Sequence, residues 1–166
     1  SLQLSGELAD GTLLGWFSAP DYVSWARERI DEGRVRGERE DDHALVTLCI
    51  LSVSDDDPTG ARRKLADWAA PQLVAMAGSG QMMALEAGRE LTAIVEERGK
   101  EAAAKDLPDD VLDAFVAAGD THRCAAMVRR LLDAGADRVV LVPNPAGQRS
   151  LEGMLEQIRR GASLLV

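Results

Sequence analysis

The sequence has few of the features that mark secreted, membrane-spanning or nucleic-acid-binding proteins. It contains only two cysteines, Cys49 and Cys124, and both lie among apolar residues, so we expect core packing rather than a disulfide or a metal site. No apolar run approaches the roughly 20 residues of a membrane span, and no signal segment opens the chain. The net charge of -9 argues against a nucleic-acid partner. We therefore expect a cytoplasmic protein without a membrane or nucleic-acid partner.

Common catalytic motifs are also missing. The sequence has no Ser-His-Asp arrangement and no HExxH, CxxC or GxGxxG pattern, and Gly78-Ser79-Gly80 lacks the Lys-Ser/Thr of a phosphate loop. The acidic run Asp55-Asp56-Asp57 lacks the central glycine and the later ligands of a calcium loop. It therefore predicts a turn that caps a helix.

Segments of strand and helix character alternate along the chain. With 166 residues and 46% hydrophobic content, one compact core is possible, and we expect one domain over residues 1–166. The helix that opens at Ser18-Ala19-Pro20 is expected to end at Gly33, and a helical insert is expected at about 77–107. A last helix is expected from Ser150, with its inner side formed by Leu151, Met154, Leu155 and Ile158. The predicted strands lie near 12–16, 44–53, 114–118 and 138–142.

The clearest unit is the stretch 111–147, which predicts strand, turn, helix and strand. An apolar run begins at Val111, and Gly119-Asp120-Thr121 breaks it, with Asp120 or Thr121 capping the next helix. Apolar residues at helical spacing follow, and Gly135 suits a left-handed helix end. Arg138–Val142 is then apolar without alternation, which is typical of a parallel strand covered on both faces.

This alternation predicts an α/β fold with a parallel sheet. Four strand–helix pairs do not close a TIM barrel, which needs eight of each and roughly 250 residues. Two architectures remain, the C-terminal half of a TIM (β/α)8 barrel or a small doubly wound α/β domain. The half-barrel predicts sequential strand order, whereas a reversal midway would indicate the doubly wound sheet.

Two segments resemble the bacterial-luciferase-like family of flavin- and deazaflavin-dependent oxidoreductases, which are built on a TIM barrel. FVAAGD (115–120), the helix end LLDAGAD and RVVLVP resemble the closing part of that family. LSGELADGTLLGW (4–16) is similar to the family's AGELADGVLLNW segment, and SAPDYVSWARERIDEGRVRGER continues the similarity. The resemblance and an apparently truncated first helix favour the half-barrel, with the four strands as strands five to eight.

Ligands of parallel α/β folds bind at the carboxyl ends of the strands. That rule predicts cofactor-binding positions at Leu14, Gly15, Trp16, Gly119 and Asn144. In the family the loop after strand five lines the flavin and substrate pocket, although Gly15 stands where Asn is common. Trp16 is equally well explained as a core or lid residue. His122 follows the helix cap, where an exposed first-turn position is favoured over a proton donor, and no catalytic residue is assigned.

The resemblance implies a luciferase-like monooxygenase or reductase that transfers hydride, with 8-hydroxy-5-deazaflavin (coenzyme F420) or FMN as cofactor and a small-molecule substrate. The missing catalytic motifs fit an enzyme whose cofactor carries the chemistry. The family's phosphate-cradling glycines are expected before Ser1, so turnover is not expected of this chain alone. We expect a homodimer, or pairing with an N-terminal half. A non-catalytic α/β binding or assembly module is the alternative.

Overall fold

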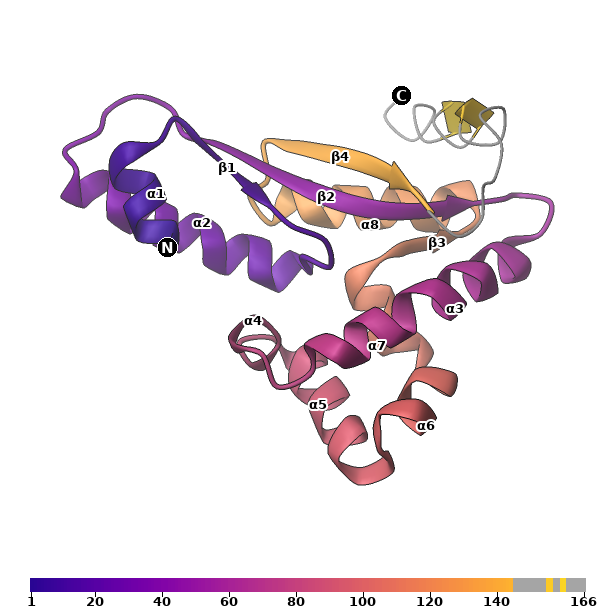
Figure 1. Ribbon diagram of the computed structural model, residues 1–166. Coiled ribbons are helices and arrows are strands. Elements are labelled where there is room, and N and C mark those ends of the chain that lie inside the picture. Colours follow the sequence, from indigo (N-terminus) through magenta and orange to yellow (C-terminus); the bar gives the residue numbers. More distant parts are fainter. Residues whose placement is uncertain (145–154, 157–158, 161–166) are drawn as a thin grey trace.

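The computed structural model describes residues 1–144, 155–156 and 159–160. In this part of the chain, four strands form one parallel sheet, and helices connect them (Figure 1), which confirms the predicted α/β class. Most of the helix predicted from Ser150 lies outside the described residues. The elements are α1 (Leu2–Leu8), β1 (Gly11–Leu14), α2 (Pro20–Arg36), β2 (Ala44–Val53), α3 (Pro58–Met76), α4 (Gly80–Met83), α5 (Glu86–Arg98), α6 (Lys100–Lys105), α7 (Asp109–Phe115), β3 (Ala117–Gly119), α8 (Thr121–Asp133) and β4 (Arg138–Pro143).

The long strand β2 is the centre of the sheet, and α2 and α8 cover one of its faces. Successive side chains of a strand point to opposite faces, and on β2 Leu45, Cys49 and Leu51 all lie in one core with apolar residues of α2 and α8. The helical residues of that core include Ile30 of α2 and Leu131 of α8. Both cysteines are free and buried, as predicted.

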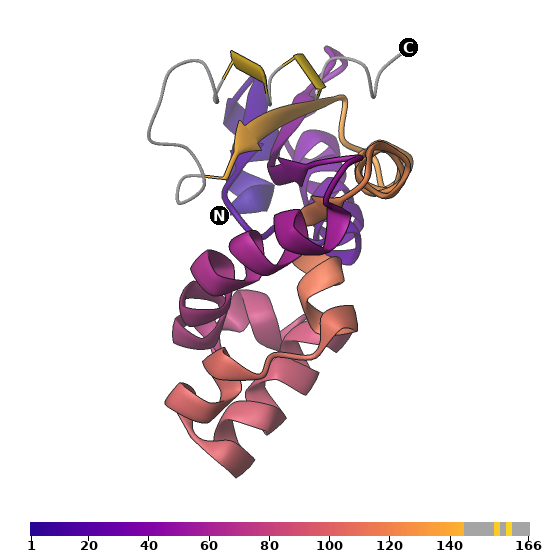
Figure 2. The same cartoon turned by 90° about the vertical axis from the view of Figure 1, so that its right-hand side faces the viewer.

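Helices α3 to α7 form a second body at the carboxyl end of β2. Its core joins Ile50 of β2 and Phe17 to α3, through Leu65 and Leu73, and continues to Phe115 of α7. Figure 2 shows these helices below the sheet, with β4 at the top of the view. No helix in the described part of the chain is long and apolar enough to cross a membrane.

The third strand is shorter than predicted, and the start of its apolar run is helical. Residues from Asp109 to Phe115 form α7, and only Ala117–Gly119 pair with β2. Two acidic residues in the first turn stabilise a helix N-terminus, and Val111 and Phe115 lie four apart, on one helical face. Both of these side chains are buried, so the same apolar residues serve a helix. The prediction of a strand over 114–118 was therefore wrong in its first half.

The strand order also departs from the sequential order that we predicted. β4 pairs with β2 and not with β3. Peptide groups alternate in direction along a strand, so residues an even number apart bond to the same edge. The N–H groups of Ala44 and Ser54 donate to the β1 and β3 sides, whereas the C=O of Leu51 accepts from Asn144 after β4. β1 and β3 therefore share one edge of β2, and β4 occupies the other.

A physical reason for this order lies in the strand lengths. β2 offers β4 six partners, from Val46 to Leu51, whereas β3 is only three residues long. Pairing with β2 therefore satisfies more backbone groups of β4 and buries more of its side chains. The sheet remains open, because no described strand pairs with the outer edges of β1, β3 or β4.

Helix α2 is longer than predicted, because Gly33 does not end it. The helix continues to Arg36, and Gly33 is buried where α2 crosses α1. Its φ is not in the left-handed region, so this glycine is selected by the close approach of another helix. Gly135, by contrast, has a φ of 105° just after α8, as its predicted role at the helix end requires.

Candidate functional site

The turn after β1 places one aromatic side chain inside the fold and leaves the next outside. Phe17 is 3% exposed and has a φ of 60°, a left-handed conformation that is costly for a bulky residue. Ser18 Oγ donates to the C=O of Gly15 (2.9 Å) and holds the turn closed. Such strain persists only where the surroundings enforce it, and it is concentrated at functional sites. The turn is therefore the best-defined candidate site in the described chain.

Trp16, in the same turn, stands against a second tryptophan. Its ring centroid lies 5.7 Å from that of Trp68 on α3, and Phe17 lies 6.1 Å from Trp68. Trp16 keeps 42% of its surface exposed, and a Cβ built on Gly15 would meet no atom within 4 Å. This arrangement offers a partly open aromatic surface beside unobstructed backbone, which suits a flat conjugated ring. The contact with Trp68 was missed, because 52 residues separate the two tryptophans.

Gly119 ends β3 and could not be replaced easily. Its φ is 131°, and a Cβ there would lie 3.2 Å from Cδ of Arg123. The following residue, Asp120, accepts a hydrogen bond from the N–H of Arg123 (2.7 Å), as the predicted helix cap requires. Gly119 therefore shapes the strand-to-helix turn, and its assigned role toward a cofactor stays a prediction.

The N-terminus of α8 is occupied by carboxylates of the protein itself. Asp55, just after β2, accepts hydrogen bonds from the N–H of Thr121 (2.8 Å) and from its hydroxyl (2.8 Å). Together with Asp120, this carboxylate takes the N–H groups of Thr121 and Arg123 and adds negative charge where an anion would otherwise bind. A phosphate is therefore not expected at this helix end. His122 is exposed in the same turn.

The aspartate at this turn makes a testable contribution to stability. The backbone N–H and then the hydroxyl of Thr121 lower the pKa of Asp55 below its ordinary value of 3.8, against a small opposing effect of burial. A lowered pKa in the fold means stability that is present above the unfolded value and lost as pH falls. Asp55→Asn is therefore expected to reduce stability at pH 7 and to flatten its decline below about pH 4.

Urea denaturation at pH 7 and pH 3 measures this effect. Asp56→Asn is the control, because the carboxylate of Asp56 makes no hydrogen bond within the described residues. If both variants lost stability equally at neutral pH, the bonds to Thr121 would not be responsible.

Asn144 follows β4 and is 3% exposed. Its N–H donates to the C=O of Leu51 (2.8 Å), which fixes the end of β4 beside β2. Pro143 is aligned with Leu51, and Gly119 with Val53, so Asn144 and Gly119 lie near the same end of β2, on opposite edges. The structure therefore brings these two predicted residues to one region.

The β1 turn lies elsewhere along β2. Leu14 is aligned with Thr47, whereas Gly119 is aligned with Val53, six residues further on. At about 3.3 Å per residue, this offset separates the two groups by roughly 20 Å. Leu14, Gly15 and Trp16 thus form one group, and Gly119 and Asn144 a second. A single small ligand would not touch both, whereas an extended one would.

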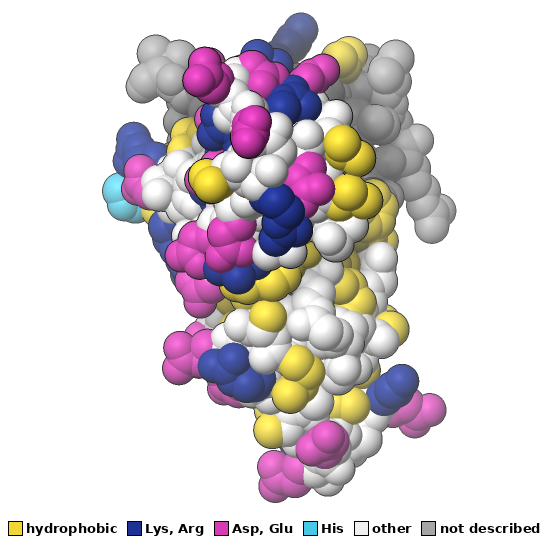
Figure 3. Space-filling view, turned by 90° about the vertical axis from the view of Figure 1, so that its left-hand side faces the viewer, with side chains coloured by type: hydrophobic (Ala, Val, Ile, Leu, Met, Phe, Trp, Pro, Cys, Tyr) yellow, Lys and Arg dark blue, Asp and Glu magenta, His cyan; other side chains and the backbone are white. Residues whose placement is uncertain are grey.

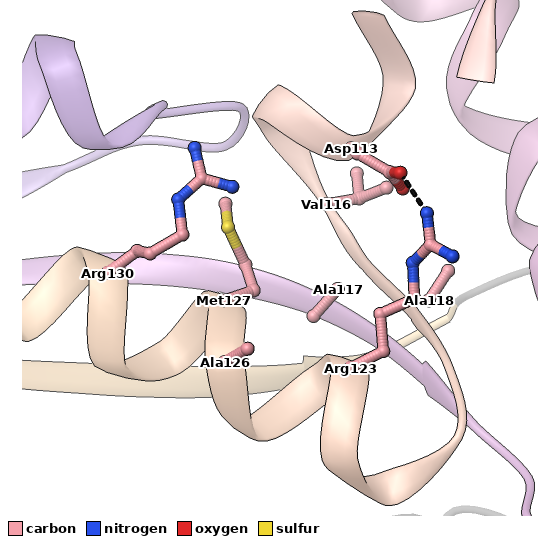
Figure 4. Close-up of a pocket in the computed structure, with 8 residues that line it drawn as sticks. All are labelled: Asp113, Val116, Ala117, Ala118, Arg123, Ala126, Met127 and Arg130. Atoms are coloured by element: carbon pink, nitrogen blue, oxygen red, sulfur yellow. Dashed lines mark hydrogen bonds and ion pairs between the residues drawn. The ribbon is translucent and has the colours of Figure 1, made fainter. Parts of the chain in front are cut away.

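A cavity of about 240 Å³ lies between α7, β3 and α8, and includes none of the five predicted residues (Figure 4). Its floor is formed by small and apolar side chains such as Ala117 and Met127. Asp113 accepts hydrogen bonds from Arg62 and from Arg123, which ties α7 to α3 and α8. Figure 4 shows Arg123 and Arg130 at opposite ends of the cavity, so the two cations do not converge on one point. The cavity is therefore not part of the candidate site.

The remaining reactive groups do not form a catalytic centre. Burial raises the pKa of the Cys49 thiol to about 12, and burial followed by the charge of Asp120 raises that of Cys124 to about 12. Neither is a thiolate nucleophile near neutral pH. Among the described residues, no three His, Cys, Asp or Glu side chains are grouped so as to hold a metal ion. In the described part of the chain, the two thiols and the acidic side chains therefore provide neither a thiolate nucleophile nor a metal site.

Comparisons with known proteins agree with this architecture. The fold is similar to coenzyme F420-dependent tetrahydromethanopterin reductase from Methanopyrus kandleri, with a TM-score of 0.63, 21% identity, and coverage of 95% of this chain and 45% of that one. It is also similar to an F420-dependent secondary alcohol dehydrogenase in complex with an F420-acetone adduct, with a TM-score of 0.66, 16% identity, and coverage of 99% and 46%.

The chain thus spans less than half the length of these enzymes and corresponds in fold to about half of each, as the half-barrel prediction requires. None of the curated proteins matches the sequence. The sequence pattern of the luciferase-like monooxygenase family matches residues 1–138, which is most of the chain. This match extends over β1, β2 and β3 together with the helices that follow them. The chain therefore belongs to the luciferase-like monooxygenase family.

Proposed function

We propose that this chain forms part of a deazaflavin-dependent oxidoreductase and that the β1 turn, Leu14 to Phe17, contacts the ring of the cofactor. The observation that carries the proposal is Trp16, exposed beside unobstructed Gly15 at the carboxyl end of a parallel strand. Carboxyl ends of strands are the binding end of TIM-barrel enzymes. The strained Phe17 and the contact with Trp68 hold Trp16 in place without filling the space in front of it.

The described residues fit the ring of such a cofactor better than its phosphate. Trp16 supplies a flat apolar surface, and Gly15 lets a ring approach the backbone closely. The N-terminus of α8, the helix that follows β3, is already capped by the carboxylates of Asp55 and Asp120. When bound, a deazaflavin supplies hydride transfer, and this chain's residues would orient the ring and exclude water from one side of it.

The deazaflavin is favoured over FMN as the cofactor. Both of the similar enzymes depend on coenzyme F420. The abundance of Ala, Arg, Asp, Gly and Val is also consistent with a GC-rich genome, where we expect the deazaflavin more often. The small-molecule substrate would enter from the same end of the sheet.

Calorimetric titration with coenzyme F420 and with FMN tests the proposal. Trp16→Ala is expected to weaken binding of the deazaflavin roughly two- to tenfold, because an aromatic contact contributes about 0.5–1.5 kcal/mol. Trp25→Ala is the matched control, since Trp25 is 41% exposed and stacks on Tyr22 of α2, away from the turn.

If Trp16→Ala and Trp25→Ala bound coenzyme F420 with equal affinity, Trp16 would have only a structural role. If the unchanged chain bound neither cofactor, the proposal would fail and a non-catalytic α/β module would become the better description.

A further inference from the structure

The β1 turn meets the helical body, which consists of α3 to α7, through aromatic side chains. Trp68 of α3 lies beside both aromatic residues of the turn, with its ring centroid 5.7 Å from that of Trp16 and 6.1 Å from that of Phe17. Figure 3 shows hydrophobic side chains gathered at the waist of the molecule, where the helical body joins the part that carries the sheet. The partly exposed ring of Trp16 is therefore in contact with a separate part of the fold.

The backbone of the turn fixes where Trp16 is attached but not which way its ring faces. Phe17 is held at a φ of 60°, and Ser18 Oγ donates to the C=O of Gly15, so the path of the backbone is set. The side chain of Trp16 is 42% exposed, and exposed side chains change rotamer within picoseconds to nanoseconds unless a neighbour blocks them. The ring of Trp68, tilted by 60° to that of Trp16, is such a neighbour, in a geometry that aromatic pairs favour.

Trp68 is positioned by the packing of the helical body. Leu65 and Leu73, on either side of it along α3, are fully buried in the core of that body, and Trp68 packs against the same core. Pro71 lies inside α3 and has no N–H, so the C=O of Asp67 loses its usual helical partner next to Trp68. This part of α3 is therefore held less by its own hydrogen bonds and more by the helices that pack against it.

We infer that the helical body controls the aromatic surface of the β1 turn, with Trp68 as the positioning residue between them. While the body is packed, Trp68 occupies one side of Trp16 and leaves the rest of that ring free for a cofactor. When the body loosens, the ring of Trp16 turns into the space that Trp68 vacates, and the flat surface is lost. Coupling of this kind is reciprocal, so a bound ring stabilises the packed body. This inference rests on the proposed function, which assigns that surface to the ring of a deazaflavin.

The mobility of Trp16 can be measured without any cofactor. The chain contains three tryptophans, so Trp25→Phe together with Trp68→Phe leaves Trp16 as the only one and keeps an aromatic ring on α3. Time-resolved fluorescence anisotropy should show little fast rotation of Trp16 in this chain, whereas Trp25→Phe with Trp68→Ala should increase its amplitude about twofold or more. Trp68→Leu takes the place of Trp68→Ala if circular dichroism shows that the alanine variant does not fold. Equal amplitudes with and without the ring would overturn the inference.

A substitution inside the helical body, away from the turn, separates control by the body from a local contact. Gly88 of α5 is buried, and a Cβ there would lie 2.1 Å from the C=O oxygen of Met82, so Gly88→Ala must displace α4 or α5. In the chain with both phenylalanine substitutions, Gly88→Ala is expected to increase the fast rotation of Trp16. Gly80→Ala in α4 is the matched control, because a Cβ there meets no described atom within 4 Å. Equal rotation of Trp16 in these two variants would show that the body does not control the surface.

Calorimetric titration with coenzyme F420 then tests the link to the cofactor. Trp68→Ala is expected to weaken binding about two- to fivefold in the unchanged chain but not in Trp16→Ala, because Trp68 acts through Trp16. Trp68→Phe should restore most of the affinity. Equal losses in both backgrounds would overturn the role of Trp68 as a positioning residue. If no chain bound the cofactor while the anisotropy differed as expected, the proposed function would fail and the control of Trp16 by the helical body would stand.

Discussion

Replacing Gly33 with alanine is expected to lower the free energy of unfolding by about 1–3 kcal/mol, the usual cost of forcing extra atoms into a packed interior. A Cβ at Gly33 would lie 2.0 Å from the C=O oxygen of Gln3, in the facing helix α1. Gly6 of α1 packs equally closely against α2. A Cβ added to Gly6 would lie 2.1 Å from the C=O oxygen of Ile30. Both obstacles are backbone atoms, so the two helices would have to separate.

Urea denaturation of Gly33→Ala and of Gly80→Ala measures this effect. A Cβ on Gly80 meets no atom within 4 Å, and alanine is the better helix former, so Gly80→Ala should be neutral or slightly stabilising. Equal stability of the two variants would mean that α1 and α2 do not cross as closely as the structure shows. A double variant that combines Gly33→Ala with Gly6→Ala should lose less stability than the two single variants lose together. Either substitution alone already separates α1 from α2.

This crossing also shows where prediction from the sequence stops. A glycine near the end of an apolar helical pattern indicates a helix end, and on that ground we predicted that Gly33 closes its helix. The local pattern contains no trace of α1, which supplies the backbone that Gly33 must accommodate. The glycine at 135 was predicted correctly, because its role depends on its own φ and not on a distant segment.

In the candidate site too, features that depend on neighbouring residues were predictable, and features that depend on distant segments were not. The helix caps at Asp57 and Asp120 were predictable, because each carboxylate bonds to an N–H three residues later. The contact of Trp16 with Trp68 and the bonds of Asp55 to Thr121 join segments far apart in the sequence, so no local pattern signals them. The strained Phe17 had no signal either, since an aromatic residue does not favour a positive φ.

The order of the strands depends on contacts between segments that lie far apart in the sequence. Composition and periodicity predicted where β2 and β4 lie, and both appear close to the predicted positions. Their pairing depends on how many residues each neighbour offers, and the helical start of residues 109–115 leaves β3 only three. We predicted that the apolar residues from 114 onward begin a strand, and we therefore expected β4 to pair with that strand. These first residues are helical instead, and β4 pairs with β2.

Arg27→Ala is expected to destabilise the fold by about 1.5–3 kcal/mol, because it removes several hydrogen bonds made by one charged group. The guanidinium donates to the C=O of Gly135 (3.1 and 2.8 Å), to the C=O of His43 (3.0 Å) and to the carboxylate of Asp137 (2.6 Å). It thereby joins α2 to the turns that precede β2 and β4. Arg27→Lys should recover only part of the loss, because an ammonium lacks the planar fork.

Asp137 gives this effect a pH dependence. Burial acts to raise the pKa of Asp137, but the N–H of Leu45 and the guanidinium of Arg27 outweigh it and lower the pKa below its ordinary value of 3.8. A lowered pKa means that the stabilisation is present above the unfolded value and is lost as pH falls. The difference in stability between the unchanged chain and Arg27→Ala should therefore be largest at neutral pH and should narrow toward pH 3.

Urea denaturation at both pH values, with Arg29→Ala beside Arg27→Ala, decides whether this network acts as described. Arg29 lies on the same helix and pairs with Glu28 and Glu32 at the surface, so its loss should cost less than about 1 kcal/mol. A similar cost for the two variants would show that Arg27 acts only as a surface charge. A large cost for Arg27→Ala that does not change with pH would assign the stabilisation to the two carbonyl groups, which do not titrate, and not to Asp137.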